Sequence, residues 1–413
     1  MEKFVVLGAS AAGTNVVRKL RELNPEAEIV LISEDTEIYS RCILYRHLEG
    51  ERDLQGLNFV GENFIERMKC RWIKGVRAVG LQTDKHKVLL SDGSEESYDA
   101  ICICTGSRTN YPPVPGIKEA TNVIGFRNYP DVLEVERRLP NVQNIFIQGA
   151  GLVGVDVMTG LLNHHKNLYI CARRGHMLSD QLDDYAASVY EKMYEAAGVN
   201  LRFGRSAKEF ILDENNFCYK ILMTDGEEIP IDLIINCAGV RANVQFLEGT
   251  DVECDRRGLI FDGYGRNNVP DVYGAGDVSG KSPIWPAAVK EGMIAAYNMS
   301  GIEKTKDDFF SSKTTMNFFG LPTMSVGNVN KYDETYTEEI FKDEEKKIYK
   351  KLVHRDGIIT GAILQGDLAY AGVITQLIRR GINVTKVKKP LFQIDYSDFF
   401  HINDDNYQFF YEE

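Results

Sequence analysis

The chain has 413 residues, of which 44% are hydrophobic and 26% charged, and its net charge at pH 7 is −12. This is the composition of an ordinary globular protein with room for two or three domains, and its acidity argues against nucleic acid or an anionic membrane as a partner. Apolar runs such as residues 231–240 are too short and too polar to cross a bilayer, and a strand starting at Phe4 leaves no room for a signal peptide. We therefore expect a cytoplasmic protein.

The chain opens with a strand, a glycine-rich turn and a helix between residues 4 and 20. In the turn, Gly8 permits a tight bend and Gly13 allows close packing of helix on strand. The small residues between them, Ser10, Ala11 and Ala12, would let a pyrophosphate approach the helix N-terminus. A second strand, residues 29–32, ends in Ser33-Glu34, where a carboxylate can bind an adenosine ribose. This pattern predicts a dinucleotide-binding unit.

The same order of elements returns between residues 144 and 162, after a hairpin signal at residues 87–93 and a proline-rich linker at residues 111–116. The second turn is a complete G-x-G-x-x-G with glycines at Gly149, Gly151 and Gly154. Its partner strand, residues 168–171, is followed by Arg173 and Arg174 in place of an acid, which favours the 2′-phosphate of NADPH over NADH. The alternative is that both arginines are solvated loop charges.

The last hundred residues differ in pattern from the rest. Residues 348–353 and 358–364 are predicted strands around an Asp-Gly turn, and the apolar residues from Leu368 to Ile378 lie on one helical face. This indicates a small α+β module. It ends in an aromatic tail that would close the module's own core, a homodimer face or a partner interface: Phe399, Phe400, Phe409, Phe410 and Tyr411.

Eight cysteines are scattered along the chain without a C-x-x-C pair, and the histidines form no cluster with metal-ligand spacing. We therefore expect no metal. Cys102 and Cys104 fall on one face of an apolar strand, which favours core packing over a ligand role.

Three further segments resemble motifs of the pyridine nucleotide-disulfide oxidoreductase superfamily, which binds FAD and NAD(P). These are residues 104–116, residues 237–243 and, with the closest match, residues 269–277. Residues 39–41 and 285–288 are most similar to NADH:rubredoxin oxidoreductases, the flavoprotein part of nitrite reductases and flavoprotein subunits of anaerobic iron–sulfur enzymes.

The resemblance implies an α/β fold with two Rossmann-like three-layer dinucleotide-binding domains and a small C-terminal α+β domain. The FAD-binding domain would be discontinuous, residues 1–112 and 243–310, with the NAD(P)-binding domain, residues 113–242, inserted between its parts. Residues 311–413 would form the C-terminal domain, at a dimer or partner interface.

The resemblance also implies the cofactor-binding residues. FAD would be held by Gly8, Ser10, Ala11, Ala12, Gly13, Glu34, Arg41, Cys42, Arg46, Ala78, Thr105, Gly106, Gly276, Asp277 and Trp285. NADPH or NADH, bound transiently, would be held by Gly149, Gly151, Leu152, Val153, Gly154, Asp156, Arg173, Arg174 and Gly239. Asp277 would bond the ribityl chain, and the helix beginning near Trp285 would point its N-terminus at the flavin. Asp156 stands where many relatives carry a glutamate that reaches toward the nicotinamide.

The function implied is that of an FAD-dependent NAD(P)H:acceptor oxidoreductase. It would pass electrons between a nicotinamide nucleotide and an iron–sulfur or rubredoxin-type carrier or partner subunit, since a flavin converts hydride transfer into one-electron steps and the chain has no paired redox cysteines.

Two alternatives remain open. In the first, Cys42 is a redox thiol activated by Arg41 and Arg46, as in single-cysteine NADH oxidases, NADH peroxidases and coenzyme A-disulfide reductases. In the second, the chain is a non-autonomous electron-transfer subunit of a larger redox complex, with its C-terminal module as the docking surface.

Overall fold

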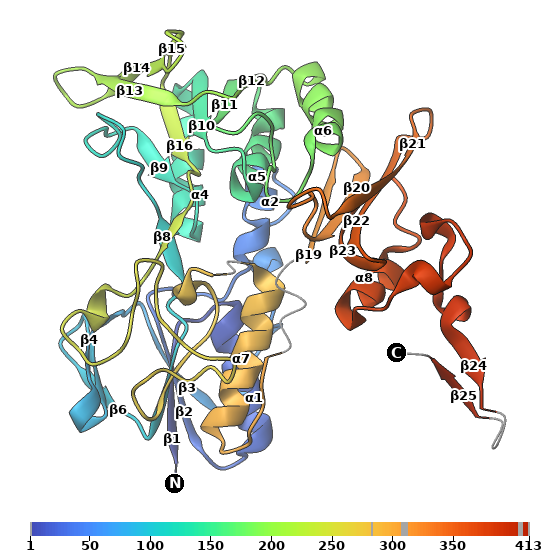
Figure 1. Ribbon diagram of the computed structural model, residues 1–413. Helices are drawn as coiled ribbons and strands as arrows, with labels where there is room; N and C mark the ends of the chain where they lie inside the picture. Colours follow the sequence, from blue (N-terminus) through green and yellow to red (C-terminus); the bar gives the residue numbers. More distant parts are fainter. Residues whose placement is uncertain (1, 282–283, 307–312, 404–407, 412–413) are drawn as a thin grey trace. The chain divides into compact units, whose positions relative to one another are not determined.

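The computed structural model describes residues 2–281, 284–306, 313–403 and 408–411 (Figure 1). The chain divides into two compact units, residues 1–171 with 206–311 and residues 172–205 with 312–413. Each is described by itself. No helix in the described ranges is long and apolar enough to cross a membrane.

The first unit contains a five-stranded parallel sheet with the order β18-β7-β1-β2-β3. Its strands are β18 (Val272–Gly274), β7 (Ala100–Ile103), β1 (Lys3–Leu7), β2 (Glu28–Ser33) and β3 (Cys70–Lys74). In the central strand, Phe4 lies opposite Ile29 on one side and Ala100 on the other. The inner strands are almost continuously apolar because both faces of the sheet are covered.

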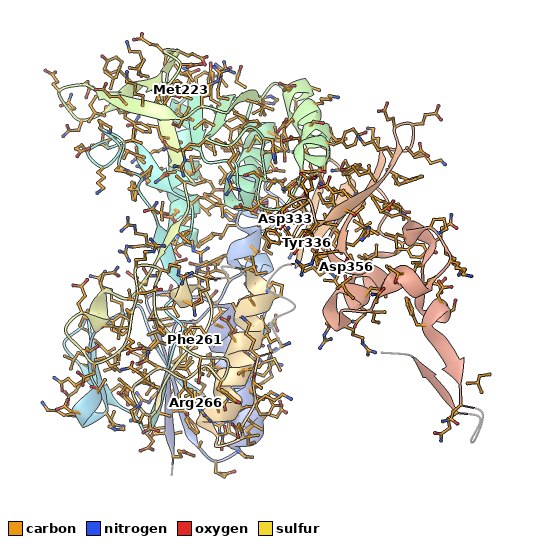
Figure 2. The ribbon with its side chains drawn as sticks, viewed as in Figure 1. Met223, Phe261, Arg266, Asp333, Tyr336 and Asp356 are labelled. Carbon is orange, nitrogen blue, oxygen red and sulfur yellow. The ribbon has the colours of Figure 1, made fainter. Side chains whose placement is uncertain are left out.

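Helices α1 (Ala11–Leu23) and α7 (Trp285–Met299) pack on one face of this sheet. The other face is covered by an antiparallel sheet made of β4 (Ala78–Gln82), β5 (Lys87–Leu90) and β6 (Glu95–Ser97). Phe261 packs into the same core from a later segment (Figure 2). Two short helices, α2 (Tyr45–Leu48) and α3 (Phe64–Arg67), follow β2 in the chain.

This unit also contains four parallel strands of a second sheet, in the order β11-β10-β16-β9. Its strands are β11 (Asn167–Ala172), β10 (Asn144–Gln148), β16 (Leu233–Asn236) and β9 (Val123–Gly125), and its helices are α4 (Tyr129–Arg138) and α5 (Leu152–Leu161). Gln148 lies opposite Cys171 and Asn236, so the central strands end at one edge of the sheet.

Two smaller antiparallel sheets complete the first unit. One is β13 (Ala207–Leu212), β14 (Cys218–Met223) and β15 (Glu228–Pro230), where Met223 is fully buried (Figure 2). The other pairs β8 (Ser107–Thr109) with β17 (Val240–Ala242). These two strands belong to the segments in which the chain leaves the first dinucleotide-binding region and later returns to it.

The second unit is built on a five-stranded antiparallel sheet with the order β19-β20-β23-β22-β21. Its strands are β19 (Lys313–Phe318), β20 (Leu321–Gly327), β23 (Ile358–Gln365), β22 (Ile348–Arg355) and β21 (Thr337–Asp343). Helices α6 (Asp184–Ala196) and α8 (Ala371–Arg380), strand β12 (Asn200–Phe203) and the pair β24 (Phe400–Ile402) and β25 (Phe409–Tyr411) belong to the same unit.

The predicted fold class is confirmed, and so are the strands of the hairpin between residues 348 and 364. The predicted domain limits at residues 112, 242 and 310 remain predictions. In the aromatic tail Phe399 is buried, and the side chains of Phe400, Phe409, Phe410 and Tyr411 lie outside the described residues.

Candidate functional site

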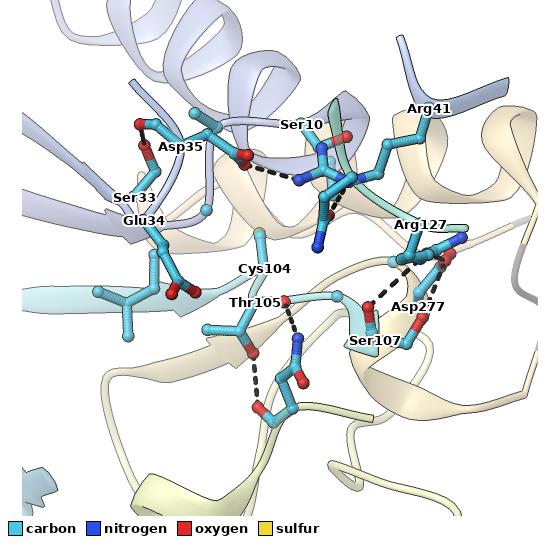
Figure 3. Close-up of a pocket in the computed structure, with 18 of the residues that line it drawn as sticks. Ser10, Ser33, Glu34, Asp35, Arg41, Cys104, Thr105, Ser107, Arg127 and Asp277 are labelled. Carbon is cyan, nitrogen blue, oxygen red and sulfur yellow. Dashed lines mark hydrogen bonds and ion pairs between the residues drawn. The ribbon is translucent and has the colours of Figure 1, made fainter. Parts of the chain in front are cut away.

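A cavity of about 1070 Å³ lies in the first unit where β1, β2, β7 and β18 end (Figure 3). Ligands of open α/β sheets bind at this carboxyl edge, and the volume is slightly above the range of about 300–1,000 Å³ that is usual for ligand sites. Of the residues predicted to hold FAD, all but Gly13 and Arg46 line it.

The turn between β1 and α1 fits a pyrophosphate. Gly8 has a φ of +109°, and an added Cβ there would collide with the carbonyl oxygen of Cys104. A Cβ at Gly13 would collide with the carbonyl oxygen of Gly8 in the same way. Ser10 is the N-cap of α1 without a side-chain capping bond, so the first N–H groups of the helix stay available to an anion.

Two adjacent carboxylates follow β2, and they have different surroundings. Asp35 accepts hydrogen bonds from the Arg41 guanidinium and the Tyr39 hydroxyl, both at 2.6 Å. Glu34 is exposed on the cavity wall without a hydrogen bond to any described residue. Glu34 is therefore the carboxylate that can accept hydrogen bonds from a ribose.

The Gly276-Asp277 turn is held from two sides. The N–H of Gly276 donates to the buried carboxylate of Glu291 at 2.8 Å. The carboxylate of Asp277 forms an ion pair with Arg127 and lies 3.5 Å from the Ser107 hydroxyl (Figure 3). Asp277 therefore presents its carboxylate to the cavity together with a cation.

Sequence reasoning missed Arg127, which lines the cavity. The residue comes just before the capping box of α4, in which Asp131 accepts the backbone N–H groups of Arg127 and Asn128 at 2.7 and 2.8 Å. The Asn-x-x-Asp spacing at the start of α4 was the signal that could have drawn attention to this position.

Arg41 is engaged by its neighbours. Its guanidinium faces the carboxylate of Asp35 (Figure 3), bonds the Asn128 side chain at 3.2 Å and lies 4.9 Å from the centre of the Tyr39 ring. Burial disfavours the charged form, but Asp35, Tyr39 and Asp277 together outweigh burial, and the pKa of Arg41 is raised above its usual value.

Cys42 is exposed on the cavity wall. Desolvation, reinforced by the carboxylate of Asp156, raises the pKa of the Cys42 thiol to about 11. The two expected activators have other partners: Arg41 bonds Asp35, and Arg46 bonds Glu49 at 3.0 Å and Glu51 at 2.7 Å. The thiol is therefore protonated at neutral pH.

The other predicted FAD residues join the two chain segments around the cavity. The Thr105 hydroxyl donates to the carbonyl of Asn243 at 2.8 Å, and the Asn243 amide donates to the carbonyl of Thr105 at 3.0 Å. Trp285 begins α7, as predicted, and its ring meets Phe59 edge-on at 4.6 Å. Ala78 and Gly106 complete the wall.

The second glycine-rich turn repeats the construction of the first. Gly149 has a φ of +109°, and an added Cβ would collide with Cys237, while a Cβ at Gly154 would collide with Gly149. Gly151 is the N-cap of α5, which begins with Leu152 and Val153. Gly239, also predicted to contact the nucleotide, is exposed at a φ of +92°.

Asp156, on the first turns of α5, is a half-buried acid. Desolvation raises the pKa of Asp156 well above its usual range, with Arg46 opposing and Glu49 adding to the rise. Its charge also acts on Cys42 and Cys237, so Asp156 lies near both thiols.

The two arginines after β11 differ in their contacts. Both are exposed. Arg174 forms an ion pair with Asp180 and bonds the Ser179 hydroxyl at 3.2 Å. Arg173 has no hydrogen bond or ion pair with another described residue. Within the described ranges no group of three His, Cys, Asp or Glu side chains could hold a metal ion.

Comparisons with known proteins identify the class. The family model described as pyridine nucleotide-disulphide oxidoreductase matches residues 2–292, and that of the rubredoxin NAD+ reductase C-terminal domain matches residues 313–382. The chain therefore belongs to the pyridine nucleotide-disulphide oxidoreductase family. The expected superfamily, an oxidoreductase of this class, and FAD and NAD(P)H as its cofactors are confirmed.

Among its relatives, nitrite reductase [NAD(P)H] of Bacillus subtilis is 23% identical over 94% of this chain, which spans 48% of that protein. The epsilon subunit of NADH-dependent phenylglyoxylate dehydrogenase of Aromatoleum evansii is 23% identical over 94% of this chain and 93% of its own. An engineered water-forming NADPH oxidase bound to NADPH has the same fold, with a TM-score of 0.84 and 21% identity over 95% of this chain and 94% of its own. The chain thus spans about half the length of the first of these relatives.

Proposed function

We propose that the chain takes electrons from a nicotinamide nucleotide into FAD and passes them to an iron–sulfur or rubredoxin-type carrier or a partner subunit. FAD, when bound, accepts a hydride and can release its two electrons singly. The observation that carries the proposal is a cavity with the size and lining of a dinucleotide site, on whose wall the thiol of Cys42 is protonated.

The residues of the cavity support FAD as its ligand. The N-terminus of α1 would bind the pyrophosphate and Glu34 the adenosine ribose, since the first offers free N–H groups and the second a free carboxylate. Asp277, with Arg127 beside it, would bond the hydroxyls of the ribityl chain. The N-terminus of α7 would stabilise negative charge on the reduced ring.

The second glycine-rich turn would bind the nicotinamide nucleotide, and we propose NADPH. Arg173 follows β11 directly and is free to meet a 2′-phosphate, whereas Arg174 is engaged with Asp180. The engineered oxidase that binds NADPH carries an aspartate-to-alanine and an adjacent alanine-to-arginine substitution. Ala172 and Arg173 have the same order here.

The C-terminal match supports a rubredoxin-type or iron–sulfur acceptor. A second candidate function is that of a non-autonomous subunit, since one full-length relative is itself a subunit of a dehydrogenase. We propose a cytoplasmic protein that works in one of these assemblies, with a homodimer as the simpler alternative.

Replacement of Cys42 by Ser tests the electron-transfer proposal against a thiol mechanism. We expect Cys42→Ser to keep its FAD and to reduce rubredoxin or ferredoxin with NADPH at a rate within about twofold of the parent, because a protonated thiol contributes little to the chemistry. The control is the flavin content of each preparation. Loss of turnover with full flavin content would support the single-cysteine alternative.

A further inference from the structure

Four segments of the first unit bring exposed cations together beside the cavity. They are β8, β17, the turn at residues 255–258 and the segment at residues 277–281. The exposed cations on these segments, which form the basic patch, are Arg108, Arg241, Arg256, Arg257 and Lys281. The whole chain carries a net charge of −12, so a surface on which cations gather is unusual in it.

Strands β8 and β17 place two of these arginines side by side. Arg108 lies directly opposite Arg241 in the antiparallel pair, so both side chains leave the same face of the two strands. Arg108 donates to the carbonyl of Ala242 at 3.0 Å, and Arg241 donates to the side-chain oxygen of Asn110 at 2.8 Å. No carboxylate in the described part of the chain pairs with either arginine. Both positive charges therefore stay uncompensated, although like charges opposite one another weaken a strand pair.

The turn at residues 255–258 packs against β17. A Cβ added at Gly258 would lie 2.7 Å from that of Ala242 and would collide with the carbonyl oxygen of Val278. The residue after Gly258 donates its N–H to that carbonyl at 2.8 Å. The turn is thus fixed between β17 and the segment at residues 277–281.

The tip of this turn carries Arg256 and Arg257. The Asp255 carboxylate accepts the N–H of Arg257 at 2.8 Å and lies 3.4 Å from its guanidinium, so this arginine is paired. Arg256 has no hydrogen bond or ion pair with another described residue. A Cβ added at Gly280 would collide with the carbonyl oxygen of Arg257, which places Lys281 next to the turn.

The basic patch borders the cavity. Arg108 and Asp277 both line it. Of the carboxylates on the four segments, Asp277 is paired with Arg127 and Asp255 with Arg257. Unpaired cations therefore prevail where Arg108 joins the cavity wall to the protein surface, and the local field is positive.

We propose that the basic patch is the docking surface for an acidic one-electron carrier protein. Clustered charge of one sign steers a partner of the opposite sign and fixes its orientation. Docking here would bring the redox centre of the carrier beside the wall that Arg108 and Asp277 share. The inference rests on the proposed function, whose partner it specifies by charge and by place.

The test compares the full-length, FAD-loaded parent with Arg241→Glu and Arg256→Glu, alone and combined. The probes are an acidic rubredoxin and, as a small acceptor, a neutral quinone, each reduced with NADPH in excess. We expect kcat/KM for rubredoxin to fall roughly threefold to tenfold in each single variant and further in the combined one, mainly through a higher KM. Reduction of the quinone, and of the flavin by NADPH, should stay within about twofold of the parent, because neither arginine lines the cavity.

The sign of the ionic-strength dependence is a second readout. Between two acidic proteins without a docking patch, added salt screens repulsion and the rate rises. Attraction at the basic patch has the opposite effect. We therefore expect kcat/KM of the parent for rubredoxin to fall with added salt, and a shallower dependence in the combined variant.

Lys85→Glu is the matched control. Lys85 is an exposed cation of the same unit, on the turn between β4 and β5, without a hydrogen bond or ion pair to another described residue. Arg256→Glu likewise breaks no such contact, so a loss in that variant reports on the patch.

Three results would overturn the inference and leave the electron-transfer proposal standing: rubredoxin kinetics of the variants equal to those of the control, a parent rate that rises with salt, or a loss confined to the Kd for NADPH. A parent whose flavin is reduced by NADPH but which does not reduce rubredoxin would overturn the proposed acceptor and the inference with it.

Discussion

The thiol of Cys42 lies on the cavity wall, yet its surroundings keep it protonated. Desolvation and the nearby Asp156 raise its pKa to about 11, and the two cations that lower it, Arg127 and Arg41, are paired with Asp277 and Asp35. With the pKa about four units above neutral pH, roughly one thiol in ten thousand is ionised at pH 7. Proximity to a flavin is not enough to make this residue a nucleophile.

The pH dependence of alkylation measures this protonation. Because only the thiolate reacts, we expect the rate of Cys42 labelling by iodoacetamide to rise about tenfold per pH unit from pH 7 to pH 10 and to level off near pH 11. Peptide mass spectrometry of the FAD-loaded protein follows Cys42, with the exposed Cys254 as an internal comparison. A labelling rate that is already constant above pH 6 would contradict a raised pKa.

The residues that sequence reasoning located are those with a local signal. Gly8, Gly13 and Asp277 belong to short motifs whose spacing follows from a tight turn or a helix start. The partners of those residues come from far along the chain: Arg127 lies 150 positions from Asp277. Arg46 was expected beside the flavin, but it does not line the cavity and its charge is taken up by Glu49 and Glu51. No local pattern distinguishes a free arginine from a paired one.

At the scale of elements, the cavity depends on the close crossing of α1 and α7. A Cβ at Gly292 of α7 would lie 2.5 Å from the carbonyl oxygen of Ala12 of α1. Gly276 lies against the same point, where an added Cβ would be 3.1 Å from that of Ala12. The two helices and the Asp277 turn therefore meet where only small residues fit.

Gly292→Ala tests this crossing. The added methyl would force the helices apart at a cost of about 1–3 kcal/mol, so we expect weaker FAD binding and a lower temperature for FAD release. The fluorescence of released FAD during heating is the measurement. Gly372→Ala in α8 is the matched control, because no atom lies within 4 Å of the added Cβ and alanine favours a helix by up to about 1 kcal/mol. Equal temperatures of FAD release in the two variants would argue against a tight crossing.

The elements themselves were largely predictable, since strand, turn and helix signals are local. The hairpin of β22 and β23 and the start of α7 fall where the sequence indicated. The attachment of α6 to the C-terminal sheet was not predictable, because Tyr190 and Thr323 lie 133 positions apart and their hydroxyls carry no periodic signal. Such contacts join elements whose own sequence patterns give no sign of the partner.

At the scale of the whole molecule, the same strand–glycine turn–helix arrangement occurs twice in the chain. Gly8 and Gly149 share a φ of +109°, and in both turns the final glycine packs against the first. Each turn leads to a helix whose N-terminus has no side-chain cap. The proposed flavin site and the proposed nicotinamide site would thus share one backbone requirement, and the side chains around each turn would decide which dinucleotide it takes.

The chain matches about half the length of a nitrite reductase [NAD(P)H] and nearly the full length of a subunit of an NADH-dependent dehydrogenase. Under the proposed function, the protein would need a hydride acceptor and an electron exit, and it would need no thiol chemistry of its own. The match of residues 313–382 to the rubredoxin NAD+ reductase C-terminal domain supports the proposed acceptor.

Anaerobic titration of the purified protein with NADPH, and separately with NADH, tests the central claim most directly. Visible absorbance follows the oxidised flavin. The account predicts a yellow protein whose flavin is bleached by one equivalent of nucleotide, faster with NADPH than with NADH, without a long-wavelength band from a Cys42 thiolate. A colourless protein, or a flavin that neither nucleotide reduces, would contradict it.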